Sequence, residues 1–297
     1  MENLDSIRIH FNPEQLMLLN LCLAFIMFGV ALDLKWRNFR LLFQQPKAAF
    51  VGLISQLLLL PLLTIGLIFL LQPPTSIALG MLLVSVCPGG NVSNFAVHIA
   101  EGNVALSVVL TTISTLAAAF TTPLLFLLLT PIIPGGASFQ QSVYISPLAM
   151  VGTIVQLLLL PLALGMLVNH RFPKFTAAIR QPIRVLSLLI FVGFVIVAIL
   201  GNFKNLQNYL HLVFWIVLLH NAIALCTGYG FALLNRLPRA DARAIALETG
   251  IQNSGLGLIL IFNFFNGLGG MAMIAAWWGV WHLISAATVA LIWKRKG

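Results

Sequence analysis

The chain has 297 residues; 60% of them are hydrophobic and only 8% carry a charge. A soluble domain carries roughly 25% charged residues, so this composition excludes a soluble globular enzyme. It also excludes a disordered chain and a secreted disulfide scaffold. We therefore expect a polytopic membrane protein, because each stretch of ~20 apolar residues can cross the lipid as a helix.

The formal net charge of +9 would suggest a nucleic-acid partner in a soluble protein. In a membrane protein the same excess is typical of basic residues that flank the spans on the cytoplasmic side. We therefore expect the lipid bilayer as the partner, with neither nucleic acid nor an obligate protein partner. Cys22, Cys87 and Cys226 lie in apolar runs and predict no disulfide framework, and the polar N-terminus predicts no cleaved signal peptide.

Nine apolar segments are separated by connections that are charged or rich in proline, glycine and asparagine, and each segment predicts a transmembrane helix. The segments cover residues 15–32, 48–71, 76–100, 104–129, 146–168, 185–201, 210–234, 244–265 and 271–293. The sequence therefore predicts an all-α polytopic membrane protein with nine transmembrane helices, in which residues 1–297 form a single integral unit.

The basic residues predict how this protein lies in the membrane. In a nine-span arrangement only Arg8 and Lys204 lie on one side, and all other lysines and arginines lie on the opposite side. Because positive residues are retained in the cytoplasm, this asymmetry places the C-terminus inside and the N-terminus outside. We expect the protein in the cell (inner) membrane.

Two of the nine segments are interrupted in the middle of the membrane. In segment 76–100, Pro88 lacks the backbone N–H that a helix needs, and Gly89 and Gly90 follow it. In segment 244–265, residues 248–257 combine glycines with amides, a hydroxyl and a carboxylate. Unwound backbone at this depth is tolerated only where it lines a cavity. Paired breaks in spans of opposite direction predict an inverted-repeat transporter whose site lies near the midplane.

The sequence Gln-Leu-Leu-Leu-Leu-Pro-Leu occurs at residues 56–62 and again at residues 156–162. The two copies fall in spans that are not counterparts in the predicted inverted repeat. Leucine-rich membrane sequences produce such matches readily, so we interpret this one as a coincidence.

Glu248 is the only acidic residue, of seven, that lies inside an apolar segment. A charge at this depth costs about 2.5–3.5 kcal/mol on insertion scales, so an intramembrane acid predicts a functional site. Gln252 lies four residues further on, and the other break offers Ser93 and Asn94. Oxygen ligands with a single carboxylate suit a hard monovalent cation such as Na⁺. The alternative is a protonated glutamic acid that is hydrogen-bonded inside the bundle.

Segment 104–129 adds four hydroxyl side chains to these candidates: Ser107, Thr111, Ser114 and Thr115. Ser107 and Thr111 are four residues apart and therefore share one helix face. Each hydroxyl could instead bond a carbonyl of its own helix, which is a common role of membrane serine and threonine. Gln56, in the middle of segment 48–71, could be a ligand or could make a structural hydrogen bond.

Three motifs resemble the bile acid:sodium symporter family: Cys-Pro-Gly-Gly-x-x-Ser-Asn at 87–94, Gly-Asn-Val-Ala-Leu-Ser at 102–107 and Glu-x-Gly-x-Gln-Asn-Ser-Gly-Leu at 248–256. The resemblance covers nearly the whole chain. It implies two crossing broken helices and a division into a core domain and a panel domain. The core would comprise the spans in residues 48–129 and 210–293, and the panel those in residues 15–32 and 146–201.

The resemblance also implies two sodium sites behind the crossing. The first would use Ser93, Asn94, Ser107, Thr111 and Glu248. The second would use Gln56, Glu248 and Gln252, together with the carbonyls of Thr249 and Ile251. The substrate contacts would be Pro88, Gly89, Asn91, Asn253 and Leu283. At Asn91, Thr249 and Leu283 the sequence departs from the common bacterial pattern, so sodium coupling is better supported than any one substrate.

Charge counting suggests a mechanism for such a site. Two sodium ions with one carboxylate leave about one positive charge, and half-helix N-termini near Asn91 and Asn253 add positive dipole ends. We therefore expect a sodium-coupled symporter that imports an organic anion by alternating access. The anion would be bile acid-like, or a small carboxylate such as pantoate or a keto acid.

Other functions are open at this point. A proton-coupled carrier or a passive channel could use Glu248 without sodium, and it would move its cargo in sodium-free medium. A carrier of a soft species could use Cys87, although the adjacent Pro88 and the sodium ligands argue against it. A membrane enzyme is not expected, because the sequence contains no Ser-His-Asp grouping, no HExxH motif and no paired carboxylates.

Overall fold

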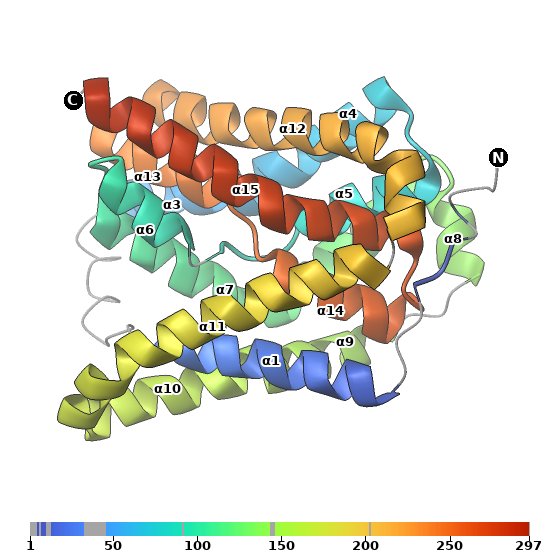
Figure 1. Cartoon of the computed structure of the whole chain (residues 1–297). Helices are drawn as coiled ribbons and strands as arrows, with labels where there is room; N and C mark the ends of the chain where they lie inside the picture. Colours follow the sequence, from blue (N-terminus) through green and yellow to red (C-terminus); the bar gives the residue numbers. More distant parts are fainter. Residues whose placement is uncertain are drawn as a thin grey trace.

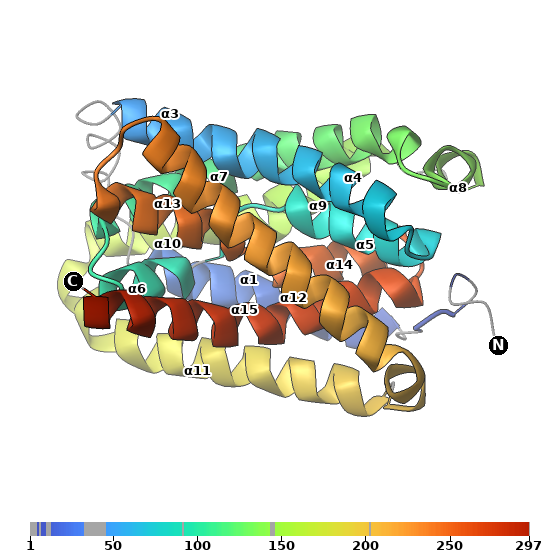
Figure 2. The same ribbon diagram turned by 90° about the horizontal axis from the view of Figure 1, so that it is seen from above.

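The computed structural model describes residues 5, 7–9, 13–32, 46–90, 92–142, 146–201 and 203–296, and all regular elements in them are helices. In chain order they are α1 (Pro13–Ala31), α3 (Pro46–Ile54), η2 (Ser55–Leu59), α4 (Leu60–Leu71), α5 (Thr75–Ser85), α6 (Val92–Ile99), α7 (Val104–Leu129), η3 (Thr130–Ile132), α8 (Gly136–Ser142), α9 (Pro147–Ile154), η4 (Val155–Leu159), α10 (Leu160–Arg171), α11 (Pro173–Gly201), α12 (Phe203–Leu234), α13 (Arg239–Gly250), α14 (Ser254–Phe264) and α15 (Gly269–Lys296). The long helices run along one common axis; α11 is tilted against it in Figure 1 and α12 in Figure 2.

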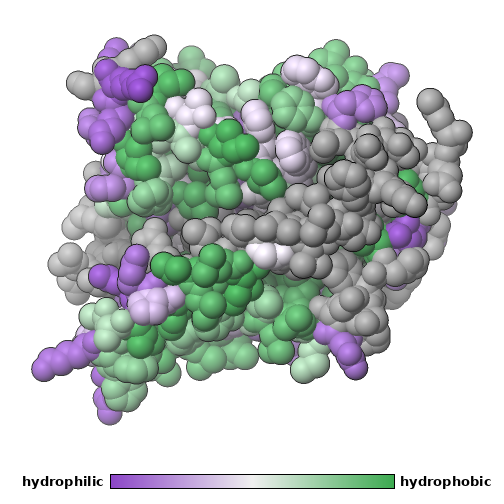
Figure 3. Space-filling view, viewed as in Figure 1, coloured by the Kyte–Doolittle hydropathy of each residue, from purple (hydrophilic) through white to green (hydrophobic). Residues whose placement is uncertain are grey.

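Within the described residues, five helical stretches are long and apolar enough to cross a membrane. They are Pro46–Leu71, Val104–Ile132, Pro147–Arg171, His211–Leu234 and Gly269–Arg295. Shorter apolar helices, α5 and α14 among them, accompany these five. Among the coloured residues of the face shown in Figure 3, hydrophobic side chains lie in the middle and hydrophilic ones gather toward the two ends of the helices. The chain is therefore an integral membrane protein.

Each apolar segment predicted from the sequence corresponds to between one and three of these helices, and α7 coincides with segment 104–129. The predicted start of segment 185–201 was wrong. The basic residues before position 185 were expected to form a connection between two spans. There α11 already begins at Pro173 and carries Lys174 and Arg180 in its first turns. Proline suits the first position of a helix, because the N–H that it lacks would have no partner there.

The two interruptions predicted from the sequence are present. α5 ends at Ser85 and α6 begins at Val92, while α13 ends at Gly250 and α14 begins at Ser254. The intervening residues 86–90 and 251–253 lie against each other in antiparallel direction, and we call these two segments the crossing. Both breaks are shorter than the motifs that predicted them, so most of the candidate side chains lie on the adjoining helices.

The helices pack in two groups. α1 packs mainly against α10, η4 and α11, whereas α15 packs against α5, α14 and α12, and α12 packs against α13. α7 contacts both groups, because it packs against α6 and α13 as well as against α9. In Figure 1 the helices α1, α10 and α11 lie together below the crossing.

Hydrogen bonds also hold the starts of the two broken spans. The carboxylate of Asp5 accepts from the backbone N–H of Ser76 at 2.7 Å, in the first turn of α5. Next to the first turn of α13, Asn103 donates from its side chain to Asp241 at 2.8 Å and from its backbone to Ala240 at 2.9 Å. The first N–H groups of a helix have no partner within it, so a capping carboxylate stabilises α5 by about 1 kcal/mol.

The repeated Gln-Leu-Leu-Leu-Leu-Pro-Leu sequence forms the same local structure twice. η2 and η4 are π-helical turns at equivalent positions, and each leads into a helix with proline in its first turn. A proline inside a helix lacks an N–H, and its ring presses on the preceding turn; a wider π turn relieves this. The interpretation of the repeat as a coincidence was therefore incomplete, because both copies make the same backbone feature.

Candidate functional site at the helix crossing

Backbone hydrogen bonds hold the crossing together. The N–H of Gly90 donates to the carbonyl of Ile251, and the N–H of Asn253 donates to the carbonyl of Pro88, both at 2.8 Å. Gly89 and Gln252 therefore face each other as a single antiparallel β-bridge. Extended backbone at membrane depth needs such partners, because lipid supplies none. The bridge places the two breaks directly against each other.

A side chain would be crowded at two glycine positions of the crossing. A Cβ on Gly89 would lie 2.7 Å from Oε2 of Glu248 and 3.1 Å from Nε2 of Gln56. A Cβ on Gly90 would lie 3.1 Å from the side chain of Ile251. Gly89 thus lets the backbone of the first break approach the carboxylate that the other broken span carries.

The carboxylate of Glu248 is buried and surrounded by hydroxyl groups. Ser93, on α6, donates to Oε1. On α7, Ser107 donates to Oε1 at 2.5 Å, and the Thr111 hydroxyl lies 2.8 and 2.9 Å from Oε1 and Oε2. Oδ1 of Asn94 joins them, 2.8 Å from the Ser107 hydroxyl. The structure thus brings together all five side chains predicted for the first sodium site; we call them the Glu248 cluster.

The Glu248 cluster holds more acceptor oxygens than hydroxyl protons. Ser107 has one proton, yet its oxygen lies within hydrogen-bond distance of both the carboxylate and Asn94. Thr111 likewise faces both carboxylate oxygens and the carbonyl of Ser107, the last at 3.0 Å. A surplus of oxygen acceptors around one carboxylate fits a hard cation and does not fit a soft metal.

Two fully buried glutamines belong to the same region. Neither amide atom of Gln56 has a hydrogen-bond partner, and Oε1 of Gln252 has none. Gln56 comes from the π turn η2, and both its amide and the Glu248 carboxylate lie beside Gly89. Leaving a buried polar group unpaired costs about 1–3 kcal/mol, so these atoms fit a site that offers them a ligand.

The two carbonyls predicted for the second sodium site lie at the crossing and already accept hydrogen bonds. The carbonyl of Thr249 accepts from Nε2 of Gln252, and that of Ile251 accepts from Gly90, both at 2.8 Å. A carbonyl oxygen has two lone pairs, so each keeps one for an ion. The hydroxyl of Thr249 lies 2.9 Å from that of Ser55, which fastens α13 to η2.

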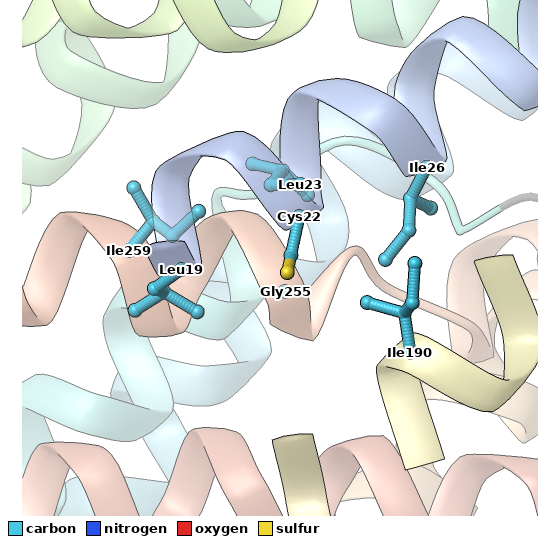
Figure 4. Close-up of a pocket in the computed structure, with 7 residues that line it drawn as sticks. All are labelled: Leu19, Cys22, Leu23, Ile26, Ile190, Gly255 and Ile259. Atoms are coloured by element: carbon cyan, nitrogen blue, oxygen red, sulfur yellow. The ribbon is translucent and has the colours of Figure 1, made fainter. Parts of the chain in front are cut away.

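An apolar pocket lies beside the crossing, between α1, α11 and α14 (Figure 4). It is lined by Leu19, Cys22, Leu23, Ile26, Ile190, Gly255 and Ile259. Gly255 lies in the first turn of α14, where Asn253 caps the helix by accepting from the N–H of Leu256 at 3.0 Å. The thiol of Cys22 points toward Gly255 in Figure 4. The pocket therefore joins the positive end of a helix dipole to an apolar wall.

Three of the five predicted substrate contacts belong to the crossing, namely Pro88, Gly89 and Asn253. Asn91 lies outside the described residues. Leu283 lies on α15, is half-buried and takes no part in the hydrogen bonds that build the crossing.

Three residues that build the crossing were not among the candidates from the sequence: Ser55, Thr122 and Asn221. Ser114 was one of the four candidate hydroxyls of segment 104–129. Ser114 accepts from the N–H of Gly89 at 3.2 Å. Its role was detectable, because it follows Thr111 by three residues on the same helix face. The other three each adjoin one further polar residue, namely Gln56, Thr121 and His220, and their spacing gives no signal for the crossing.

Known proteins share this sequence pattern. The model of the Sodium Bile acid symporter family matches residues 20–209, which is more than half of the chain. The chain belongs to the sodium bile acid symporter family. This agrees with the resemblance carried by the motifs at the two breaks.

Relatives of this family member include bacterial, plant and animal proteins. The uncharacterized sodium-dependent transporter YocS of Bacillus subtilis (strain 168) is 37% identical over 274 residues, which are 92% of this chain and 82% of that protein. The probable sodium/metabolite cotransporter BASS2, chloroplastic, of Oryza sativa subsp. japonica is 32% identical over 283 residues, with 93% and 63% coverage. The P3 protein of Bos taurus is 27% identical over 259 residues, with 85% and 52% coverage. The chain thus spans less than two thirds of the plant and animal proteins.

Proposed function

We propose that this protein is a sodium-coupled symporter that carries an organic anion across the membrane by alternating access. The observation that carries the proposal is the Glu248 cluster, in which a buried carboxylate, three hydroxyls and an amide oxygen meet where two broken helices cross. These oxygens suit a hard monovalent cation, and membership of a sodium symporter family supports Na⁺ as that cation.

Two sodium ions are proposed as cargo. The first would bind in the Glu248 cluster. The second would bind between Gln56, Gln252 and the Glu248 carboxylate, and the unpartnered amide oxygens support this position. Two ions against one carboxylate leave a surplus of positive charge at the crossing, which favours an anionic substrate.

The proposed substrate is an anion with an apolar body. α6 and α14 both begin at the crossing, and the N-terminus of a helix favours a negative group. The anionic group would lie against Pro88, Gly89 and Asn253, and Asn91 and Leu283 would tune which anion is accepted. The apolar side chains of α1, α11 and α14 beside the crossing would contact the rest of the molecule.

Transport would require the helices of the proposed panel, α1 and α9 to α11, to move against the proposed core, α3 to α7 and α12 to α15. The packing in two groups supports this division, and the pocket lies where the groups meet. Sodium and substrate would each strengthen the binding of the other by the same factor, because coupling between sites is reciprocal. Sodium entry down its gradient would then drive uptake.

Sodium binding to the purified protein tests this proposal. We expect NaCl, but not KCl at the same ionic strength, to raise the apparent Tm, because a ligand at about 100 times its Kd stabilises the folded state by about 2.7 kcal/mol. Glu248→Gln keeps the side-chain shape, removes the charge and is expected to abolish the shift. Glu101→Gln makes the same change at an exposed acid between α6 and α7 and is expected to preserve it.

A screen of organic anions by the same measurement, with and without sodium, would then identify the substrate. Uptake of that anion into proteoliposomes is expected to collapse in sodium-free medium. Persistent uptake without sodium, or a wild-type sodium response in Glu248→Gln, would instead favour a proton-coupled carrier or a passive channel.

A further inference from the structure

Each broken span has one carbonyl at its break bound by a side chain from a neighbouring helix. At the end of α5, the hydroxyl of Thr122 on α7 donates to the carbonyl of Val86 at 2.8 Å. At the end of α13, the amide of Asn221 on α12 donates to the carbonyl of Gly250 at 2.7 Å. Both side chains are buried, with 0% and 1% of their surface exposed. We call these two hydrogen bonds the crossing ties.

The crossing ties fix the direction in which the chain leaves each helix. The last carbonyls of a helix have no partner within it, and lipid offers none. Each tie satisfies one of these carbonyls and thereby holds the peptide plane at the start of the break. Close behind each tie, the carbonyls of Pro88 and Ile251 accept the backbone hydrogen bonds of the crossing. The crossing ties therefore also help to orient the backbone groups that form the hydrogen bonds of the crossing.

The tie from Asn221 lies next to the proposed sodium ligands along the chain. Gly250 directly follows Glu248 and Thr249, so a shift of its peptide plane would displace both residues. The surroundings leave little room for such a shift to be absorbed, because a Cβ on Gly250 would lie 2.5 Å from the side chain of Leu225. Groups that orient metal ligands from behind typically contribute 10–100-fold to metal affinity.

The tie from Thr122 holds the break between α5 and α6. α7 carries Thr122 as well as Ser107 and Thr111 of the Glu248 cluster, so the tie keeps the first break in register with these hydroxyls. The hydrogen bond from the N–H of Gly89 to Ser114, which also lies on α7, holds the first break against this helix as well. No proposed sodium ligand adjoins Val86 in the sequence, so this tie is expected to matter less than the one from Asn221.

We propose that Asn221 and Thr122 are positioning residues of the sodium site. They touch neither ion nor substrate; they hold the ends of α13 and α5 so that the oxygen ligands keep their spacing. This role rests on the sodium coupling proposed above, and it goes beyond it by assigning two residues outside the ligand sets.

Sodium titrations of the purified full chain, read as the apparent Tm, test the positioning role. Asn221→Leu removes the amide donor at similar volume and is expected to raise the half-maximal sodium concentration at least about tenfold. Thr122→Val removes only the hydroxyl and is expected to raise it several-fold. Thr122→Ser restores a hydroxyl and is expected to return it toward the wild-type value.

Thr121→Val and Asn235→Leu are matched controls. The hydroxyl of Thr121 donates to Ala117 at 3.1 Å, and the amide of Asn235 donates to Phe231 at 2.9 Å, so both bond only the preceding turn. Loss of a purely structural hydrogen bond lowers the Tm without sodium but leaves the half-maximal sodium concentration unchanged. This is the result expected for both controls.

Two outcomes would overturn the positioning role alone. One is a wild-type half-maximal sodium concentration in both Asn221→Leu and Thr122→Val; the other is an equal loss of sodium affinity in the controls. Thr122→Val, the milder change, decides by itself if Asn221→Leu does not fold. A wild-type protein without a sodium-specific shift would contradict the proposed sodium coupling, and the positioning role with it.

Discussion

At the scale of single residues, Glu248 is surrounded by polar groups that come from other helices. Its carboxylate receives hydroxyl groups from α6 and α7, and the first break passes directly beside it. That approach depends on Gly89, because any side chain there would occupy the space between the break and the carboxylate. A carboxylate that lipid cannot solvate is thus satisfied entirely by the protein and by whatever ligand joins it.

Gly89→Ala is expected to damage sodium binding more than it damages the fold. The added methyl group would lie 2.7 Å from Oε2 of Glu248, so the carboxylate would have to move. Overpacking of this kind costs about 1–3 kcal/mol, and we expect the sodium affinity, measured by titration of the Tm, to fall roughly tenfold.

Gly66→Ala is the control for this change, because a Cβ there meets nothing within 4 Å. It is expected to leave sodium affinity unchanged and to raise stability by up to about 1 kcal/mol, since alanine favours the helix. Wild-type sodium affinity in Gly89→Ala would contradict the closeness of Gly89 to the ion ligands.

At the scale of elements, one repeated sequence has different consequences in two places. η2 presents Gln56, which is fully buried beside the crossing, whereas η4 presents Gln156, which is exposed. A π turn holds more residues than an α turn, so it changes which face of the helix each neighbouring residue occupies. The local backbone is the same in both copies, and only the helices packed around each copy differ.

Pro61→Ala and Pro161→Ala form a matched pair that tests this difference. Without proline, each π turn is expected to relax to α-helix, and one extra residue in the helical register corresponds to a rotation of about 100°. Pro61→Ala should turn Gln56 from the crossing and weaken sodium binding in the Tm titration, while Pro161→Ala should leave it within about twofold. Equal loss in both variants would mean that the role given to Gln56 is wrong.

At the scale of the whole molecule, two groups of helices meet beside the crossing, and the apolar pocket lies between them. Residues 7–9 and the end of α15 lie at opposite ends of the molecule (Figure 1). This arrangement agrees with an odd number of membrane crossings. The basic residues then favour a cytoplasmic C-terminus.

Fusions to the C-terminus test this orientation in bacterial cells. Lys294, Arg295 and Lys296 are the last three residues of α15, and basic residues stay in the cytoplasm, so a green fluorescent protein fused there is expected to fluoresce. Alkaline phosphatase, which is active only outside the cytoplasm, is expected to be inactive at the same position. An active phosphatase fusion with a dark fluorescent fusion would reverse the proposed orientation.

Much of the fold and part of the site could be predicted from the sequence by itself. The helical membrane class follows from composition, the first break from the missing N–H of Pro88, and the site from the cost of placing Glu248 in lipid. These are local properties that need no knowledge of the partners. The sequence also offered the members of the Glu248 cluster as candidates, and the resemblance of the motifs grouped them into one sodium site; the structure brings these five side chains together.

Only the tertiary structure decided which other side chains complete the crossing. Thr122 and Asn221 bind carbonyls that lie 36 and 29 residues away, and the sequence near each of them does not indicate that partner. The burial of Gln56 but not of Gln156 was decided in the same way, although the six residues that follow each glutamine are identical. The physical reason is that a contact between helices depends on their rotation and tilt, and periodicity within one helix leaves both undefined.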